Sequence, residues 1–303
     1  MNWNLNSGYG AHLANAIMTA GPTGKIFVVG ATGVAYRGQI SQLFQPDVDG
    51  RVRFASTIAA AVALCTANGN DQIVVLPGHT ESITSAAAID INVAGVTIRG
   101  VGSGAQRPTL TWTTAVGASV NVTAANVTID NLILDLTGFD NITSGLNVTA
   151  ANFTLSNCYV ITATATNQAA LALTSTAAAN RLRILSNEFI GTTDAGTAAA
   201  LQIVGGNEHA IIGNRFYGAY TAGIGAINNI TTACLRIRVT DNIIENATAA
   251  STKAMVFVAG STGSISRNAM QILSGTAPIT GAAMSWVGQN YYAATIATAG
   301  TLI

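Results

Sequence analysis

A stretch of sequence returns after 26 residues in the middle of the chain. Residues 121–131 read NVTAANVTIDN and residues 147–157 read NVTAANFTLSN, so the first six letters are identical. A period of 20–50 residues is typical of solenoids and propellers, in which each repeat buries its apolar side chains only against its neighbours. This repeat constrains the fold more than any other feature of the sequence.

The repeat continues as a series of asparagines, each followed two positions later by a large apolar residue. Asn tolerates a left-handed backbone, and stacked amides can bond to one another, so we expect the asparagines to form one column at a bend. The predicted asparagine ladder is Asn131, Asn157, Asn187, Asn214, Asn242 and Asn268. The apolar residues are predicted to form one interior line, namely Ile133, Tyr159, Phe189, Phe216, Ile244 and Met270.

The asparagines are separated by 26–30 residues, and short β-branched segments lie between them. This pattern predicts an all-β fold, a right-handed single-stranded parallel β-helix of about 8 turns. Two or three short strands in each turn would pair with the turns above and below, about 4.8 Å away. A propeller blade needs about 40–45 residues, and leucine-rich repeats need more leucine and a helix or 3₁₀ turn in each repeat.

The repeat does not cover the whole chain, so we expect further elements at both ends, because solenoids need caps. Ser56 precedes an Ala-rich segment and is the predicted N-cap of a capping helix. The segment GKIFVVG at 24–30 reads as a strand that could add to the sheet edge of a neighbour. The predicted parts are an N-terminal arm or attachment element (1–50), a capping helix (51–70), the parallel β-helix (71–290) and a C-terminal cap (291–303).

Composition limits the partners and cofactors that we expect. Thirteen basic residues balance thirteen acidic ones, and charged residues make up only 9% of the chain, so no basic cluster favours nucleic acid. The sequence contains no run of about 18 apolar residues, so we expect no membrane span. The start of the chain lacks the pattern of a secretory signal. The three cysteines, Cys65, Cys158 and Cys234, are widely spaced and predict free thiols rather than a metal site. We expect no cofactor and no bound metal.

Acidic residues that could act together in glycoside cleavage are few. Asp130, Asp135 and Asp140 are the only trio that we weigh for this role, and solvation or turn formation is the simpler interpretation. His79 and His209 are predicted to have structural roles. His12 has no identifiable partner in the sequence. The sequence therefore predicts that the protein is not an enzyme.

Several charges recur at a fixed distance from the asparagines. Arg181, Glu208 and Arg236 each lie six positions before one, and Glu188 and Arg215 each lie one position after one. Stacked turns would place these opposite charges about 5 Å apart. Exposed pairs of this kind stabilise a fold by only about 0–1 kcal/mol each, so we expect a minor structural role.

The order of a helix, the segment DQIVVLPGHTE at 71–81 and turns of 26–30 residues resembles the pectin-lyase-like right-handed β-helix superfamily. More narrowly, GKIFVVG followed by RFASTIAAAVALCTANGNDQIVVLPGHTESI at 53–83 resembles the N-terminal half of β-helix proteins encoded among the virion genes of tailed bacteriophages. The superfamily includes polysaccharide lyases, hydrolases, tailspikes, adhesins and virion decorations, so the fold alone does not determine the function.

The resemblance and the composition together favour a non-enzymatic structural protein of a phage virion, assembled in the cytoplasm of the bacterial host. We expect it to decorate or cement the capsid through its N-terminal region. The expected partners are further copies of itself in a homotrimer, and the major capsid protein or another virion protein. Broad faces of Ala, Thr and Val suit burial between copies. The alternative is a tailspike or receptor-binding fibre that recognises or cleaves a host surface polysaccharide. A free polysaccharide lyase is disfavoured by the lack of an acidic cluster.

Overall fold

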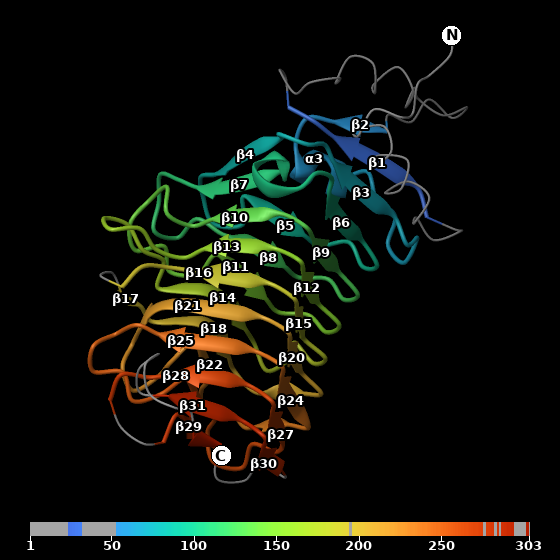
Figure 1. Cartoon of the computed structure of the whole chain (residues 1–303). Coiled ribbons are helices and arrows are strands. Elements are labelled where there is room, and N and C mark those ends of the chain that lie inside the picture. The colour runs from blue at the N-terminus through green and yellow to red at the C-terminus, as the bar shows by residue number, and fades with distance from the viewer. Residues whose placement is uncertain are drawn as a thin grey trace.

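The structure is a computed structural model that describes residues 24–31, 53–193, 196–274, 277–281, 284, 286–293 and 301–302. Within these residues nearly all regular structure is β, and parallel sheets wind around one apolar interior (Figure 1). The chain forms a β-solenoid of about eight turns, with β1–β3 at one end and β31 at the other. The predicted fold class is confirmed.

Each complete turn passes through three sheets, which we name A, B and C. Sheet A contains, in spatial order, β2 (Phe54–Ala55), β1 (Ile26–Val29), β3 (Gln72–Val75), β6 (Thr97–Gly100), β9 (Thr128–Asp130), β12 (Thr154–Ser156), β15 (Arg183–Leu185), β20 (Ala210–Ile212), β24 (Ile237–Thr240), β27 (Gly263–Ser266) and β30 (Trp286–Gly288). Sheet B contains β4 (Thr80–Ile83), β7 (Thr109–Trp112), β10 (Ile133–Asp135), β13 (Tyr159–Ile161), β16 (Glu188–Ile190), β21 (Arg215–Tyr220), β25 (Ile243–Asn246), β28 (Ala269–Gln271), β31 (Tyr291–Ala293) and β32 (Thr301–Leu302).

Sheet C contains β5 (Ile89–Ile91), β8 (Val120–Val122), β11 (Leu146–Val148), β14 (Leu171–Ser175), β18 (Ala199–Ile203), β22 (Ile227–Asn229), β26 (Met255–Val256) and β29 (Ile279–Thr280). Three short strands lie outside these series, namely β17 (Gly196–Thr197), β19 (Gly206–Asn207) and β23 (Cys234–Leu235). Pairing is parallel throughout the stack, and β32 alone among the described strands runs antiparallel to its partner, β31. The pairing continues through sheet B to 291–293, part of the predicted C-terminal cap.

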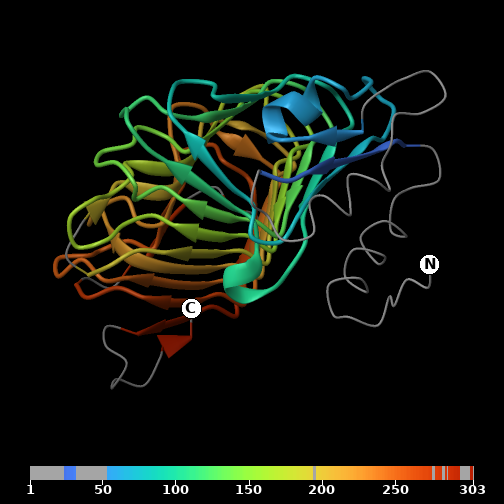
Figure 2. The same cartoon turned by 90° about the horizontal axis from the view of Figure 1, so that it is seen from above.

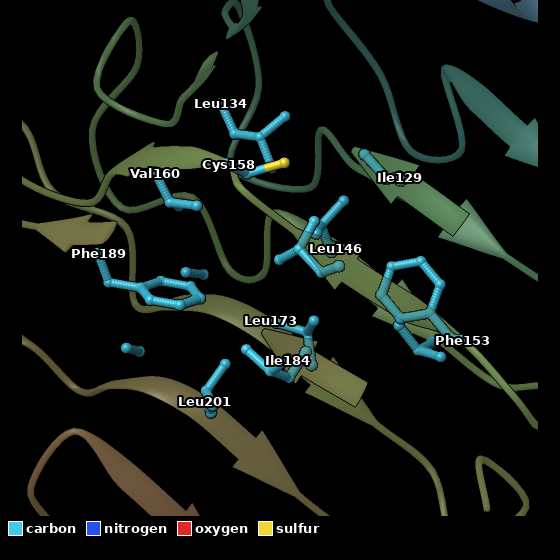
Figure 3. Close-up of a cluster of buried hydrophobic side chains, with 14 of the residues drawn as sticks. Ile129, Leu134, Leu146, Phe153, Cys158, Val160, Leu173, Ile184, Phe189 and Leu201 are labelled. Carbon is cyan, nitrogen blue, oxygen red and sulfur yellow. The ribbon is translucent and has the colours of Figure 1, made fainter. Parts of the chain in front are cut away.

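Alternation of side chains along each strand places every second residue in the interior. In sheet A one interior column is almost entirely β-branched, and each member is at most 2% exposed. That column is Ile73, Ile98, Ile129, Leu155, Ile184, Ile211, Val239 and Ile265. Figure 3 shows how Ile129 and Ile184 point toward Leu146, Leu173 and Phe189 from the other sheets. One continuous core therefore runs along the coil.

Two bends in each turn use a single residue in the left-handed region, where φ is between 54° and 79°. At the corner from sheet A to sheet B these residues are Asn131, Asn157, Ser186, Gly213, Asp241, Arg267 and Gln289. At the bend that leads into sheet A, which comes from sheet C in every turn after the first, they are Asn70, Gly95, Asn126, Asn152, Arg181, Glu208 and Arg236. Asn and Gly adopt this conformation at little cost, which explains why the repeat is rich in both.

The predicted capping helix is present but short. Helix α3 (Ile58–Val62) buries Ile58 and Val62 against the core at the end of the coil, where it contacts β1, β2, β3 and β5 (Figure 2). Its N-cap is Thr57, whose Oγ1 accepts a hydrogen bond from the Ala60 backbone N–H. The prediction of Ser56 as N-cap is therefore wrong by one residue, because Thr57 holds the extended backbone that precedes the first helical residue.

The strand predicted at 24–30 is part of the solenoid itself. β1 lies between β2 and β3 in sheet A, with Phe27, Val28 and Val29 buried. Two buried side chains hold its ends. Asp71 accepts the Lys25 N–H at 2.8 Å, and Nδ1 of His79 accepts the Ala31 N–H at 3.0 Å. The expectation of a strand free to pair with a neighbouring protein does not fit this arrangement. The rest of the predicted arm, residues 1–23 and 32–50, lies outside the described residues.

Candidate functional site

The corner from sheet A to sheet B contains a ladder of buried asparagines. Each amide except that of the last member donates from Nδ2 to the Oδ1 atom of the next asparagine at 2.9–3.0 Å, and that same Oδ1 accepts the backbone N–H of the donor residue. Each Nδ2 also donates to a backbone carbonyl of the preceding turn. The members are Asn187, Asn214, Asn242, Asn268 and Asn290, and none is more than 2% exposed.

The structure places two of the predicted ladder residues elsewhere. Asn131 and Asn157 occupy the left-handed position of the corner, and the buried position that follows holds Leu132 and Cys158. The register explains the error. Ser156 pairs with Leu185, an offset of 29 residues, whereas Asn157 and Asn187 are 30 apart in the sequence. Two different uses of asparagine, a left-handed bend and a buried amide, therefore look like one column in the sequence.

The same shift of one residue affects the predicted interior line. Phe189, Phe216, Ile244 and Met270 share one interior column of sheet B, and the rings of Phe189 and Phe216 stack with centroids 4.9 Å apart. In the two earlier turns the interior positions belong to Leu134 and Val160. Ile133 and Tyr159 point outward and are half-buried, so their prediction as interior residues is wrong. Counting from the wrong asparagine position moved them to the other face of the strand.

The charge column at the bend from sheet C to sheet A consists of Arg181, Glu208 and Arg236 in three successive turns. Oε1 of Glu208 lies 3.0 Å from the nearest nitrogen of Arg236, and Oε2 lies 3.9 Å from that of Arg181. Asn152 continues the column toward the N-terminal end, where it accepts a hydrogen bond from Nε of Arg181. These side chains are roughly half exposed, so the pairs stabilise the coil by about 0–1 kcal/mol each.

Glu188 and Arg215 are direct register partners in β16 and β21, on the outer side of sheet B. Both side chains are exposed, and within the described part of the chain neither forms an ion pair. Their two charges are therefore available to a partner.

The three carboxylates considered for catalysis hold different parts of the coil together. Asp130, on the outer side of sheet A, accepts hydrogen bonds from Arg99, Ser156 and Asn157. Asp135, on sheet B, accepts from both the backbone and the hydroxyl of Thr137. Asp140 lies in the following loop and accepts from Asn141 and the Gln168 backbone. Each carboxylate thus stabilises a local bend or a neighbouring turn. Among the described residues no group of three His, Cys, Asp or Glu side chains has the arrangement of a metal site.

Two histidines are buried and act as hydrogen-bonding links. Nδ1 of His209 accepts the Leu182 N–H at 3.2 Å, and its Nε2 lies 2.9 Å from the Gly205 carbonyl, to which it donates. Burial lowers the pKa of His209, partly offset by the bond to Gly205. Nε2 of His79 lies 3.2 Å from Glu81, whose carboxylate also accepts the first N–H of α3 from Ile58. Both histidines therefore link segments of the chain; His12 lies outside the described residues.

The three thiols are protected rather than activated. Burial raises the pKa of Cys65, Cys158 and Cys234 to about 12 in each case. All three are free of disulfide bonds. A thiol needs a depressed pKa to act as a nucleophile near neutral pH, so these cysteines fit packing roles.

The outer surfaces of sheets A and B are the broadest features that remain, and we name them face A and face B. On face A, Leu185 and Ile212 are half-buried next to the exposed Arg183 and Arg238. On face B, Ile190 and Tyr217 are half-buried, and Ile243 and Tyr291 are 54% and 58% exposed. The repeat pattern did not single out these residues, although they alternate along the strands with the interior residues.

No model of a known protein family matches this chain, and neither a curated protein nor a solved structure gives a significant match. No helix in the described ranges has the length and apolar character needed to cross a membrane.

Proposed function

We propose that the protein is a non-enzymatic structural component of a tailed-bacteriophage virion. In this proposal it decorates or cements the capsid as a homotrimer and attaches through its N-terminal region. The resemblance of residues 24–30 and 53–83 to phage β-helix proteins supports the class.

The observation that carries the proposal is the way in which the solenoid uses its few polar groups. The buried amides of the asparagine ladder bond to one another and to backbone carbonyls, and the three candidate carboxylates hold bends and neighbouring turns. We expect a chain built in this way to be stiff, because its polar groups are already bonded within the coil. A stiff coil suits a load-bearing or surface-covering role, because its contacts with other proteins need no rearrangement of the backbone.

The proposal is tested with capsids of the phage from which the gene for this chain has been deleted. The purified full chain should sediment with these capsids, whereas a variant that begins at Gly24 should fold normally and lose binding. Truncation at Arg51 is unsuitable, because it would remove β1 from the middle of sheet A. Failure of the full chain to bind capsids would overturn the proposal.

A second candidate is a receptor-binding fibre that recognises a host glycan. The observation in its favour is the presence of Tyr159, Tyr217 and Tyr291 on face B, since aromatic rings provide flat apolar surface with a polar edge. Tyr159 also lies under the guanidinium of Arg107, 5.8 Å from the ring centroid. Saturable binding of purified host polysaccharide, lost in Tyr217→Ala, would favour this candidate over capsid decoration.

A further inference from the structure

We propose that face A of one subunit packs against face B of the next, so that parallel copies close a ring around the corner between the two sheets. This inference deepens the proposed homotrimer by identifying the surfaces that form it. Among the described residues, several charges at matching heights on the two faces form no ion pair.

Some charges near these faces have a partner in the same chain. Arg99 pairs with Asp130, and Arg267 pairs with Asp241 through two hydrogen bonds of 2.7 Å. Arg183 and Arg238 on face A, and Glu188 and Glu245 on face B, form no ion pair within the described ranges. Arg215 on face B is a fifth described charge without an ion pair, in a chain with only 9% charged residues.

The two sets lie at equal heights along the coil. β15 and β16 are consecutive strands of one turn and carry Arg183 and Glu188. β24 and β25 are consecutive strands two turns later and carry Arg238 and Glu245. Rotation about an axis parallel to the coil preserves height. Arg238 and Glu245 both lie on the side of their strand away from the shared corner and would therefore meet directly. Glu188 lies next to the corner, two residues from the position that faces Arg183, so the long Arg183 side chain would reach it diagonally.

The apolar residues of the two faces also complement each other in size. On face A the turn between the two arginines presents Ala210, which is register partner to both. On face B the same turn presents Tyr217, placed between Ile190 and Glu245. Both positions lie on the side of their strand away from the shared corner, so the ring of Tyr217 would cover the small Ala210. Ile212 would meet the aliphatic part of Arg215, which keeps its charged end in water.

The area of each contact is modest, and a ring gives every subunit two contacts. Strands of three residues in eight stacked turns form a face of roughly 10 Å by 38 Å, or about 380 Å² before side-chain relief. Each contact joins one face A to one face B and therefore uses about 380 Å² of flat area per partner, about half of the roughly 800 Å² per partner of a standard interface, and a subunit in a ring makes two such contacts. The corner itself would face the axis, and the paired Asp241 and Arg267 would leave it without net charge there.

The test measures the mass of the purified full chain by analytical ultracentrifugation and native mass spectrometry. Three copies of the 30.8 kDa chain should give about 92 kDa. The variant Arg183→Glu/Arg238→Glu should already be a folded monomer at concentrations at least about a hundredfold higher than those at which the wild type dissociates, because like charges then meet across the contact. Adding Glu188→Arg/Glu245→Arg in the same chain should restore the trimer. The control Gln202→Glu/Thr280→Glu places two charges on the outer side of sheet C and should stay trimeric.

A wild-type chain that is monomeric at these concentrations would overturn the inference. So would a fourfold variant that stays monomeric, or a control that dissociates as readily as the face A variant. Capsid binding is a separate measurement. A trimer that assembles as described and does not bind capsids would count against the proposed function, and capsid-bound monomers would count against the present inference alone.

Discussion

Replacement of Asn214 by alanine tests the asparagine ladder at its centre. The Asn214 amide donates to the carbonyl of Ile184 at 2.8 Å and to Asn242 Oδ1 at 3.0 Å. Its Oδ1 accepts the backbone N–H of Asn187 at 2.9 Å. Alanine would leave that buried N–H without its acceptor and the Ile184 carbonyl without this donor. An unsatisfied buried polar group costs about 1–3 kcal/mol, so we expect Asn214→Ala to lower the free energy of unfolding by about 2–4 kcal/mol.

Asn157 provides the matched comparison, because its amide is exposed and its backbone is left-handed, with φ 54°. Asn157→Ala should cost about 1 kcal/mol, the strain of alanine in this conformation. Asn157→Gly should be within about 0.5 kcal/mol of the wild type, because glycine adopts the same φ freely. The measurement compares the free energies of unfolding of the wild type and the three variants. They are obtained from guanidinium unfolding followed by circular dichroism, with all proteins at one concentration. If Asn157→Ala is destabilised as strongly as Asn214→Ala, the distinction between bend and ladder positions is refuted.

Three further outcomes follow from buried groups. His209 should make the stability of the protein depend on pH, because its pKa is lower in the folded chain than in the unfolded chain. The unfolded chain therefore binds the proton first as the pH decreases. The contribution of His209 should be complete above about pH 6.5 and should fall as the pH decreases toward the pKa of the folded chain. His209→Asn, which keeps an acceptor for Leu182 and does not titrate, should show a shallower fall between about pH 7.5 and 5.5; an unchanged slope would contradict the assignment. Phe216→Ala should cost about 3–5 kcal/mol and Tyr159→Ala much less, since Phe216 is fully buried and Tyr159 lies on the outer side, and equal losses in thermal unfolding would contradict the register of sheet B. Cys158 and Cys234 should resist alkylation near neutral pH until the chain unfolds, and rapid labelling of the native protein, read by mass spectrometry, would show that these thiols are more open than their burial indicates.

The sequence predicts the fold well because equivalent positions in successive turns of a solenoid recur at a nearly constant spacing along the chain. The period, the number of turns and the charge column of Arg181, Glu208 and Arg236 could all be obtained by counting from a recurrent residue. Counting fails where one residue type has two uses. Asn157 and Asn187 serve different positions of the corner, and the single-residue difference also moved Tyr159 from the outer face to the predicted interior.

The role of β1 could not be read from the sequence for a different reason. The segment at 24–30 is separated from the first repeat, and its place depends on long-range bonds to Asp71 and His79, 46 and 48 residues away. The unpaired charges on faces A and B could not be predicted from the sequence either. Glu188 and Arg215 look like an ion pair by spacing, and only the side-chain positions show that the pair does not form.

The central proposal, that this chain is a structural protein of a phage virion, is tested most directly by its copy number in purified particles of a phage whose genome carries its gene. Quantitative mass spectrometry, with the major capsid protein as internal reference, gives this ratio without any assumption about binding sites. Capsid decoration predicts a copy number comparable to that of the major capsid protein. A copy number as low as that of the tail proteins would support the receptor-binding fibre instead, and absence of the chain from the particle would contradict the account.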